Sequence, residues 1–166
     1  MRTAADEAPG QLPQRVARIT LDERTVLRRS PAIEHEREAA ITDLLKDNRF
    51  APESGLVGPF HLNLAIAENR LAIEIRALAD GTSETIMLPL APFRRIVKDY
   101  FLVCESYYEA IRGKSLTQVE AIDVGRRSLH DEGSALLVKR LASKVAIDHA
   151  TARRLFTLIC VLHLRA

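Results

Sequence analysis

The chain has 166 residues, of which 47% are hydrophobic and 28% are charged, and its formal net charge is +2. This composition is typical of a globular domain with a hydrophobic core and excludes a disordered chain. Residues 1–92 hold 11 basic and 14 acidic side chains, whereas residues 93–166 hold 13 and 8. We therefore expect an anionic partner to bind the basic C-terminal half.

The N-terminal residues, MRTAADEAPGQLP, mix proline, glycine and acidic side chains without periodicity. They predict a disordered tail over 1–13, followed by a single domain over 14–166. The tail contains no apolar stretch of the kind that marks a signal peptide. Together with a cysteine count of only two, this predicts a cytoplasmic protein with reduced thiols.

The first elements of the domain are a strand and a helix. The alternation in RVARITLDE, residues 15–23, predicts the strand. Ser30 followed by Pro31 is a typical start for a helix, which we expect to fade near Asn48. Residues 51–59 contain two prolines and two glycines and predict a loop.

A β-meander is expected next. In FHLNLAIA, LAIEIRAL and ETIMLPL, apolar and polar side chains alternate, and the short turns ENR and DGT separate the three segments. These residues, 60–90, predict three antiparallel strands, or four if the strand at 15–23 joins them. One face of such a sheet is apolar and needs a covering layer of helices.

The remaining chain predicts helices. A broad apolar stripe begins at Pro92 and runs to about Arg112. Ser115 and Gln118 form a capping-box pattern at the start of the next helix. Two glycines predict a break near residues 129–132, and Asp148 is expected to cap the last helix. The predicted fold is therefore α+β, with a small antiparallel meander packed against a layer of C-terminal helices.

The last helix is apolar on nearly every side between residues 155 and 164. We expect a domain of this size to cover about half of it, so that a second chain covers the rest and the protein is a homodimer. The alternative is that the helices over 115–145 close over it within one chain. The apolar run is too short to cross a bilayer, which takes about 20 residues, so we expect no membrane association.

Four segments carry a resemblance to a known family: EHEREAAITDLL (34–45), PFRRIVKDYFLVCESYYEAI (92–111), LHDEGS (129–134) and TARRLFTLICVLH (151–163). They closely resemble the alphaproteobacterial "uncharacterised protein family" numbered 0262, over roughly residues 15–165. The resemblance implies a bacterial, cytoplasmic protein. It implies no activity.

His130 and Glu132 are candidates for a ligand-binding or catalytic site, because an imidazole beside carboxylates can act as a general base. Neighbouring side chains on a helix diverge by about 100°, however, so they cannot all reach one atom. The simpler interpretation is that Asp131 caps a helix beginning at Gly133 and that His130 ends the helix before it. No ligand spacing for a metal is present, so we expect neither a metal nor another cofactor.

Adjacent arginines occur at 28–29, 94–95, 126–127 and 153–154. Arginines near a helix N-terminus can hold a phosphate or carboxylate together with free N–H groups. Each could instead pair with a nearby carboxylate, as Arg95 could with Asp99 one turn later, and this is the simpler interpretation. The candidate anion ligands are Arg94, Arg95, Arg126, Arg127, Arg153 and Arg154.

Residues 141–156, LASKVAIDHATARRLF, resemble a helix-turn-helix in their buried positions. In that arrangement His149, Thr151, Arg153 and Arg154 would face a DNA groove. The most favoured function is a non-enzymatic binding or regulatory homodimer with an anion site in its basic half. The alternatives are a nucleic-acid-binding protein using 141–156 and an enzyme centred on His130 and Glu132. Cys104 and Cys160 lie in apolar stripes and are expected to be buried thiols.

Overall fold

The computed structural model describes residues 13–24 and 30–163, so most of the tail expected over 1–13, and the Arg28–Arg29 pair, lie outside the described residues. The strands are β1 (Val16–Leu21), β2 (Phe50–Pro52), β3 (Phe60–Ala67), β4 (Arg70–Ala77), β5 (Ser83–Pro89) and β6 (Val145–Ile147). The helices are α1 (Pro31–Lys46), the short 3-10 turn η2 (Ala91–Phe93), α2 (Arg94–Gly113), α3 (Leu116–Leu141) and α4 (His149–Leu162).

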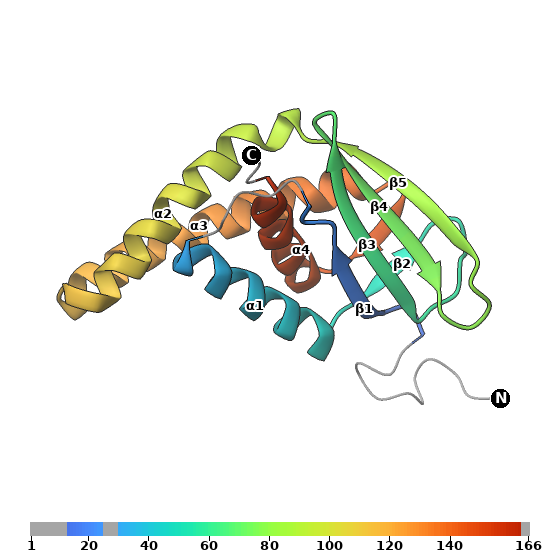
Figure 1. Ribbon diagram of the computed structural model, residues 1–166, viewed down its shortest axis with the longest axis horizontal. Helices are drawn as coiled ribbons and strands as arrows, with labels where there is room; N and C mark the ends of the chain where they lie inside the picture. Colours follow the sequence, from blue (N-terminus) through green and yellow to red (C-terminus); the bar gives the residue numbers. More distant parts are fainter. Residues whose placement is uncertain (1–12, 25–29, 164–166) are drawn as a thin grey trace.

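The predicted α+β fold is confirmed: a four-stranded sheet of order β1-β3-β4-β5 packs against the helices (Figure 1). Strands β3, β4 and β5 form the expected antiparallel meander. The first strand joins it, but it runs parallel to β3, so the sheet is mixed. A parallel pair needs a long crossover connection, and α1 with β2 supplies it.

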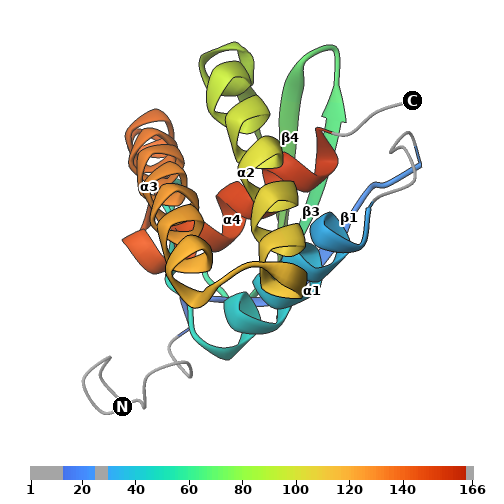
Figure 2. The same cartoon turned by 90° about the vertical axis from the view of Figure 1, so that its left-hand side faces the viewer.

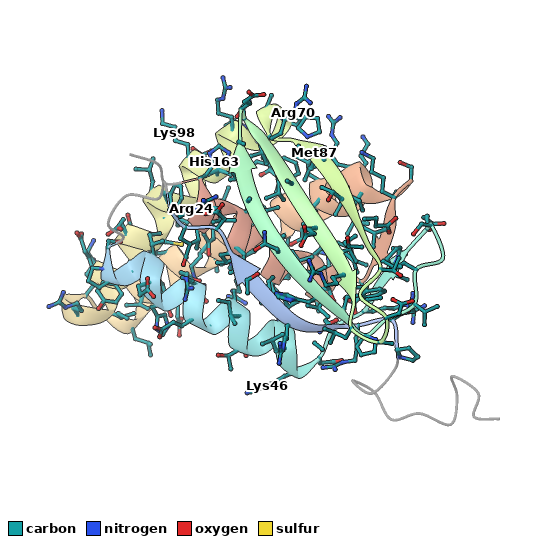
Figure 3. All side chains as sticks on the ribbon, turned by 45° about the vertical axis from the view of Figure 1, so that its right-hand side comes forward. Arg24, Lys46, Arg70, Met87, Lys98 and His163 are labelled. Atoms are coloured by element: carbon teal, nitrogen blue, oxygen red, sulfur yellow. The ribbon has the colours of Figure 1, made fainter. Side chains whose placement is uncertain are left out.

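The two faces of the sheet differ as the alternation predicts. The face toward the helices is buried and includes Leu62, Leu64, Leu71, Ile73, Ile75, Ile86 and Leu88. On the other face the Thr20 hydroxyl donates to Asn63 at 2.7 Å, and Met87 is exposed. Figure 3 shows Met87 on β5 and Arg70 at the start of β4 on the solvent side of the sheet. The buried side chains of sheet and helices form one cluster, which supports the proposal of a single domain over 14–166.

A second, two-stranded sheet pairs β2 with β6 in antiparallel register, Phe50 opposite Ile147. Sequence analysis missed both strands. Each has three residues, too few for a visible alternation, and β2 begins just before the segment that we expected to be a loop. This sheet fixes the connection between α3 and α4.

Side chains also bind the edges of the main sheet. The buried Asn48, just beyond α1, accepts from the Val16 N–H at 2.7 Å and donates to the Val16 carbonyl at 2.9 Å. It also donates to the Leu44 carbonyl, so it ties the end of α1 to β1. At the opposite edge, the Lys144 ammonium donates to the Met87 carbonyl of β5 at 3.1 Å.

The C-terminal helix α4 lies at the centre of the fold, in contact with α1, α2 and α3 (Figures 1 and 2). Every residue from Leu155 to Leu162 is buried, with at most 4% exposure. The expectation that one chain covers only half of this helix is therefore wrong. The chain itself covers α4, through α3 as in the stated alternative and also through α1 and α2. In the described part of the chain no helix is both long and apolar enough to span a membrane.

Helix α3 is continuous from Leu116 to Leu141, so the predicted break near 129–132 is wrong. Asp131 lies within the helix and does not cap one. The glycine that suggested the break, Gly133, instead permits close packing, because a Cβ atom there would lie 2.4 Å from the Phe156 ring of α4. Phe156 is fully buried and meets the Tyr100 ring edge-on, so it has little room to move.

We predict that Gly133→Ala lowers the free energy of unfolding by about 1–3 kcal/mol, because overpacking a close contact outweighs the gain in helix propensity. Gly125→Ala in the same helix is the matched control. A Cβ atom at Gly125 would meet only the Val103 side chain, at 3.8 Å, so this change should stabilise the chain by up to about 1 kcal/mol. Urea unfolding measures both; equal effects of the two changes would contradict the packing described.

We also predict that Leu158→Asp and Val161→Asp each unfold the chain, because both side chains are at most 1% exposed and a buried unpaired charge is very costly. Leu116→Asp is the control, since Leu116 is 74% exposed at the start of α3. Circular dichroism and light scattering check the outcome. If Leu158→Asp instead gave a folded monomer, this result would support the hypothesis that α4 forms a dimer contact.

Candidate functional site

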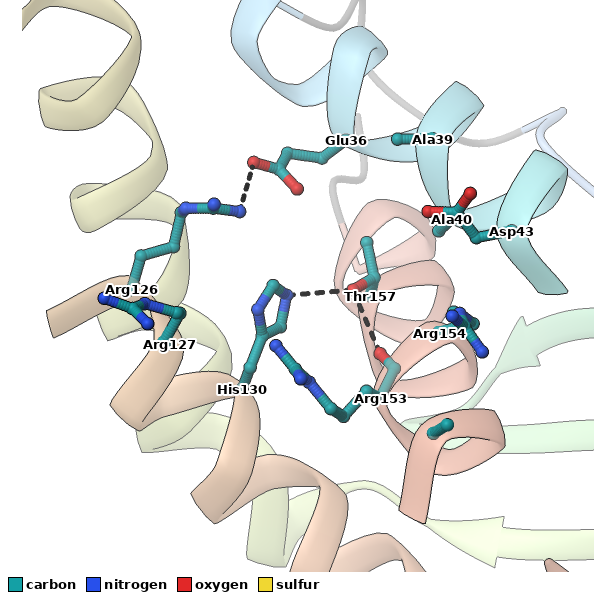
Figure 4. A pocket seen from close by; sticks show the side chains of 11 residues that line it. Glu36, Ala39, Ala40, Asp43, Arg126, Arg127, His130, Arg153, Arg154 and Thr157 are labelled. Carbon is teal, nitrogen blue, oxygen red and sulfur yellow. Dashed lines mark hydrogen bonds and ion pairs between the residues drawn. The ribbon is translucent and has the colours of Figure 1, made fainter. Parts of the chain in front are cut away.

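A cavity of about 290 Å³ opens between α1, α3 and α4, and we call it the arginine cavity (Figure 4). Its charged and polar lining comprises Arg126, Arg127 and His130 from α3, Arg153, Arg154 and Thr157 from α4, and Glu36 and Asp43 from α1. The fold thus brings together five of the eight residues singled out in the sequence. Four arginines face two carboxylates, so the side chains that line the cavity carry a net positive charge.

The two α3 arginines are held by carboxylates. Arg126 lies 3.2 Å from Glu36 and 2.8 Å from Asp123, and its guanidinium stacks over the Tyr107 ring. Arg127 also reaches Asp123, at 3.2 Å. Because Arg126 and Glu36 are both largely buried, their pair fixes α3 against α1.

The two α4 arginines are less engaged. Arg153 approaches Asp131 only to 4.0 Å, which is longer than a hydrogen bond. Arg154 donates to the Asp47 carbonyl at 3.5 Å, and no carboxylate in the described part of the chain lies within 4 Å of it. Helix α4 begins beside the cavity, where Ala150 of its first turn lines the wall. The positive end of the helix dipole adds to the field of these arginines.

His130 links three helices beneath the cavity. Its Nε2 atom lies 3.1 Å from the Tyr100 hydroxyl of α2 and 3.1 Å from the Thr157 hydroxyl of α4. Tyr100 donates its proton to Glu36, and Thr157 donates its proton to the Arg153 carbonyl. Each hydroxyl has a single proton, which is engaged in this way, so both oxygens can share the one Nε2–H of the neutral imidazole as acceptors.

Burial keeps His130 neutral. The side chain is 8% exposed, and burial, together with the positive charges of Arg126 and Arg153, lowers the pKa of His130 to about 4. The Nδ1 atom is buried without a hydrogen-bond partner among the described residues. His130 therefore holds Thr157 in the wall of the cavity and Tyr100 of α2 beneath that wall.

Glu132 does not share this site. It pairs with Arg95 of α2, which also reaches Asp99 at 3.2 Å. The predicted Arg95–Asp99 pair is thus confirmed, whereas a catalytic site built on His130 with Glu132 is not formed. Arg94 is exposed at the start of α2. Neither α2 arginine lines the arginine cavity.

The helix-turn-helix prediction for residues 141–156 is wrong. Strand β6 occupies the place of the turn and pairs with β2. Thr151, expected to face a groove, is fully buried and accepts from the Arg49 N–H at 3.0 Å. Seven residues, 142–148, separate α3 from α4, and the pattern of buried residues did not reveal the strand among them.

Cys104 and Cys160 are buried free thiols, as predicted. Burial raises the pKa of the Cys104 thiol to about 12 and raises the pKa of Cys160 as well. Both are therefore thiols at neutral pH and poor nucleophiles. Among the described residues, no group of three or more His, Cys, Asp or Glu side chains is arranged to hold a metal ion.

The chain is thus a mixed-sheet α+β protein with a basic cavity between its helices. Its sequence is similar to those of known proteins. It matches the model of the "Uncharacterised protein family (UPF0262)" over residues 13–165. A UPF0262 protein of Rhodospirillum rubrum is 59% identical over 147 residues, covering 89% of this chain and 91% of the relative. Another, from Rhodopseudomonas palustris, is 55% identical over 157 residues, covering 94% and 96%.

A UPF0262 protein of Nitrobacter hamburgensis is 55% identical over 149 residues, covering 90% of this chain and 91% of the relative. No solved structure matches the chain. The chain belongs to this uncharacterised family, and the resemblance inferred from its motifs is confirmed.

Sequence analysis identified none of Glu36, Asp43 and Thr157 as cavity residues. Asp43 and Glu36 lie seven residues apart on α1, or about two turns, and so share a helix face. That spacing was visible in the sequence. The fact that this face meets α3 and α4 was not.

We predict that acid destabilises the chain through His130. Its pKa is about 4 in the folded state and about 6.5 when unfolded, so the unfolded state binds more protons between these values. The free energy of unfolding should therefore fall by up to about 3 kcal/mol as the pH drops from 7 to 4. His130→Gln should lose this part of the pH dependence.

Urea unfolding between pH 4 and pH 7 measures the effect, and His35→Gln, at an exposed position of α1, is the control. NMR titration of the imidazole provides an independent value. A His130 midpoint near 6.5 would contradict the buried, neutral state.

Proposed function

We propose that the protein binds a small oxyanion, a phosphate or carboxylate group, in the arginine cavity, and that it acts as a binding protein. The observation that carries this proposal is the convergence of Arg126, Arg127, Arg153 and Arg154 from two helices on one cavity of about 290 Å³. Guanidinium groups match the geometry of oxyanions and form their strongest hydrogen bonds with them.

The unequal engagement of the arginines supports this proposal. Arg126 and Arg127 pair with Asp123 and Glu36, so their guanidinium groups are already held in position and part of their charge is neutralised. Arg153 and Arg154 have no carboxylate within hydrogen-bonding distance in the described part of the chain. A ligand oxyanion would supply the acceptors that they lack, at little cost in side-chain ordering for the α3 pair.

A binding role is favoured over catalysis by the state of His130. Its proton is shared between Tyr100 and Thr157, and its other nitrogen is buried, so it offers no general base to a ligand in the cavity. Cys104 and Cys160 are buried thiols with raised pKa values and offer no nucleophile. Two unbridged cysteines also support the proposed cytoplasmic location.

The expected homodimer stays a prediction, without its original support. It was based on the apolar C-terminal helix, and that helix is covered by its own chain. Light scattering on the wild-type chain at micromolar concentration tests the oligomeric state directly.

We predict that inorganic phosphate or acetate shifts the NMR signals of the cavity residues and that Arg154→Ala weakens this binding about 10-fold or more. A hydrogen bond to a charged group contributes about 1.5–3 kcal/mol. Arg94→Ala removes the same charge outside the cavity and should leave binding unchanged. Added salt should weaken binding in the wild type.

The absence of any shift with both anions at low salt would overturn the proposal. Equal weakening by Arg94→Ala and Arg154→Ala would also overturn it, because the effect would then come from overall charge.

A further inference from the structure

The walls of the arginine cavity differ in chemistry. The α3 and α4 walls present the four arginines, whereas the α1 wall presents the carboxylates of Glu36 and Asp43 (Figure 4). Both kinds of group face one space, so a ligand that fills the cavity meets both. The character of the α1 wall therefore restricts which oxyanions fit.

Glu36 and Asp43 are in different states. Glu36 accepts from Arg126 at 3.2 Å and from Tyr100 at 3.1 Å, so its negative charge is largely compensated by groups of the protein itself. Asp43 is exposed, and no ion pair or hydrogen bond joins its carboxylate to another described residue. In particular, Asp43 does not reach the Arg154 guanidinium of the facing wall.

An unpaired carboxylate weakens a site for a bare oxyanion, because like charges repel across a small cavity. It strengthens the site for a ligand that also carries a hydrogen-bond donor on the side facing α1. The cavity volume lies near the lower end of the roughly 300–1,000 Å³ range of small-molecule sites, which fits a compact metabolite.

From these observations, and resting on the proposed oxyanion binding, we propose that the ligand carries a hydroxyl or ammonium group a few bonds from its oxyanion. The oxyanion binds Arg153 and Arg154, and the donor group binds Asp43. Amino acids, aminoalkyl phosphates and phosphorylated polyols have this chemistry. A bare inorganic anion lacks the second point of attachment.

Matched ligands test the inference on the full chain. Ethyl phosphate, 2-hydroxyethyl phosphate and 2-aminoethyl phosphate share one oxyanion and differ only in the donor; propionate and β-alanine make the same comparison for a carboxylate. Within the series that binds, we expect the ligand with a donor group to bind about 10-fold more tightly than the ligand without one. One charge-assisted hydrogen bond accounts for a difference of this size. The series that binds tells phosphate from carboxylate, and the better donor tells hydroxyl from ammonium.

Asp43→Ala should abolish this gain without weakening ethyl phosphate or propionate. Glu38→Ala removes another exposed carboxylate of α1, outside the cavity lining, and should preserve the gain. If the plain ligands bind through Arg154 but the donor adds nothing, or if the gain survives in Asp43→Ala, the inference fails while oxyanion binding stands. If no ligand of either series binds, both proposals fail.

Discussion

The close approach of α3 to α4 at Gly133 is the constraint on which the rest of the helical layer depends. Only a residue without a side chain leaves room there for the Phe156 ring. One turn before Gly133, the same approach brings His130 within 3.1 Å of Thr157. Two turns before it, Arg126 and Arg127 come to the same cavity as Arg153 and Arg154. A wider spacing would leave His130 without its acceptor on α4 and the four arginines on separate surfaces.

The hydrogen bonds around His130 connect the four helices in one network. The hydroxyls of Tyr100 and Thr157 share the Nε2 atom of His130, and they donate hydrogen bonds to Glu36 and to the Arg153 carbonyl. Buried polar groups are costly unless their partners are in place, so alternative packings of α1, α2, α3 and α4 are penalised. The network thus sets the positions of Glu36 on one wall and of the Arg153 backbone on the other, and it does not engage the guanidinium groups of α4.

The sequence predicted the elements of the fold well, because the signals for them are local. Alternation identified β3, β4 and β5, and capping residues placed the starts of α1, α3 and α4 at Ser30, Ser115 and Asp148. Errors arose where a local signal had two physical causes. A glycine breaks a helix in isolation, but at Gly133 it permits contact with Phe156, and that contact depends on a residue 23 positions later.

The candidate site was only partly predictable for the same reason. The arginine pairs were visible as a pattern, yet nothing local separates Arg94 and Arg95, which lie outside the cavity, from Arg153 and Arg154, which line it. The parallel pairing of β1 with β3 and the coverage of α4 likewise depend on contacts between distant segments. An apolar helix must be covered, but its sequence does not say by which chain.

The side chains at the two edges of the main sheet have a consequence for how this protein meets other chains. A strand edge with unsatisfied N–H and C=O groups can recruit a foreign strand and so begin aggregation. At one edge the Asn48 amide forms hydrogen bonds with the N–H and C=O groups of Val16. At the other edge the Lys144 ammonium donates to the Met87 carbonyl, and the nearby Pro89 has no N–H group. At these two positions the backbone is therefore unavailable to a foreign strand, which disfavours the addition of a strand there.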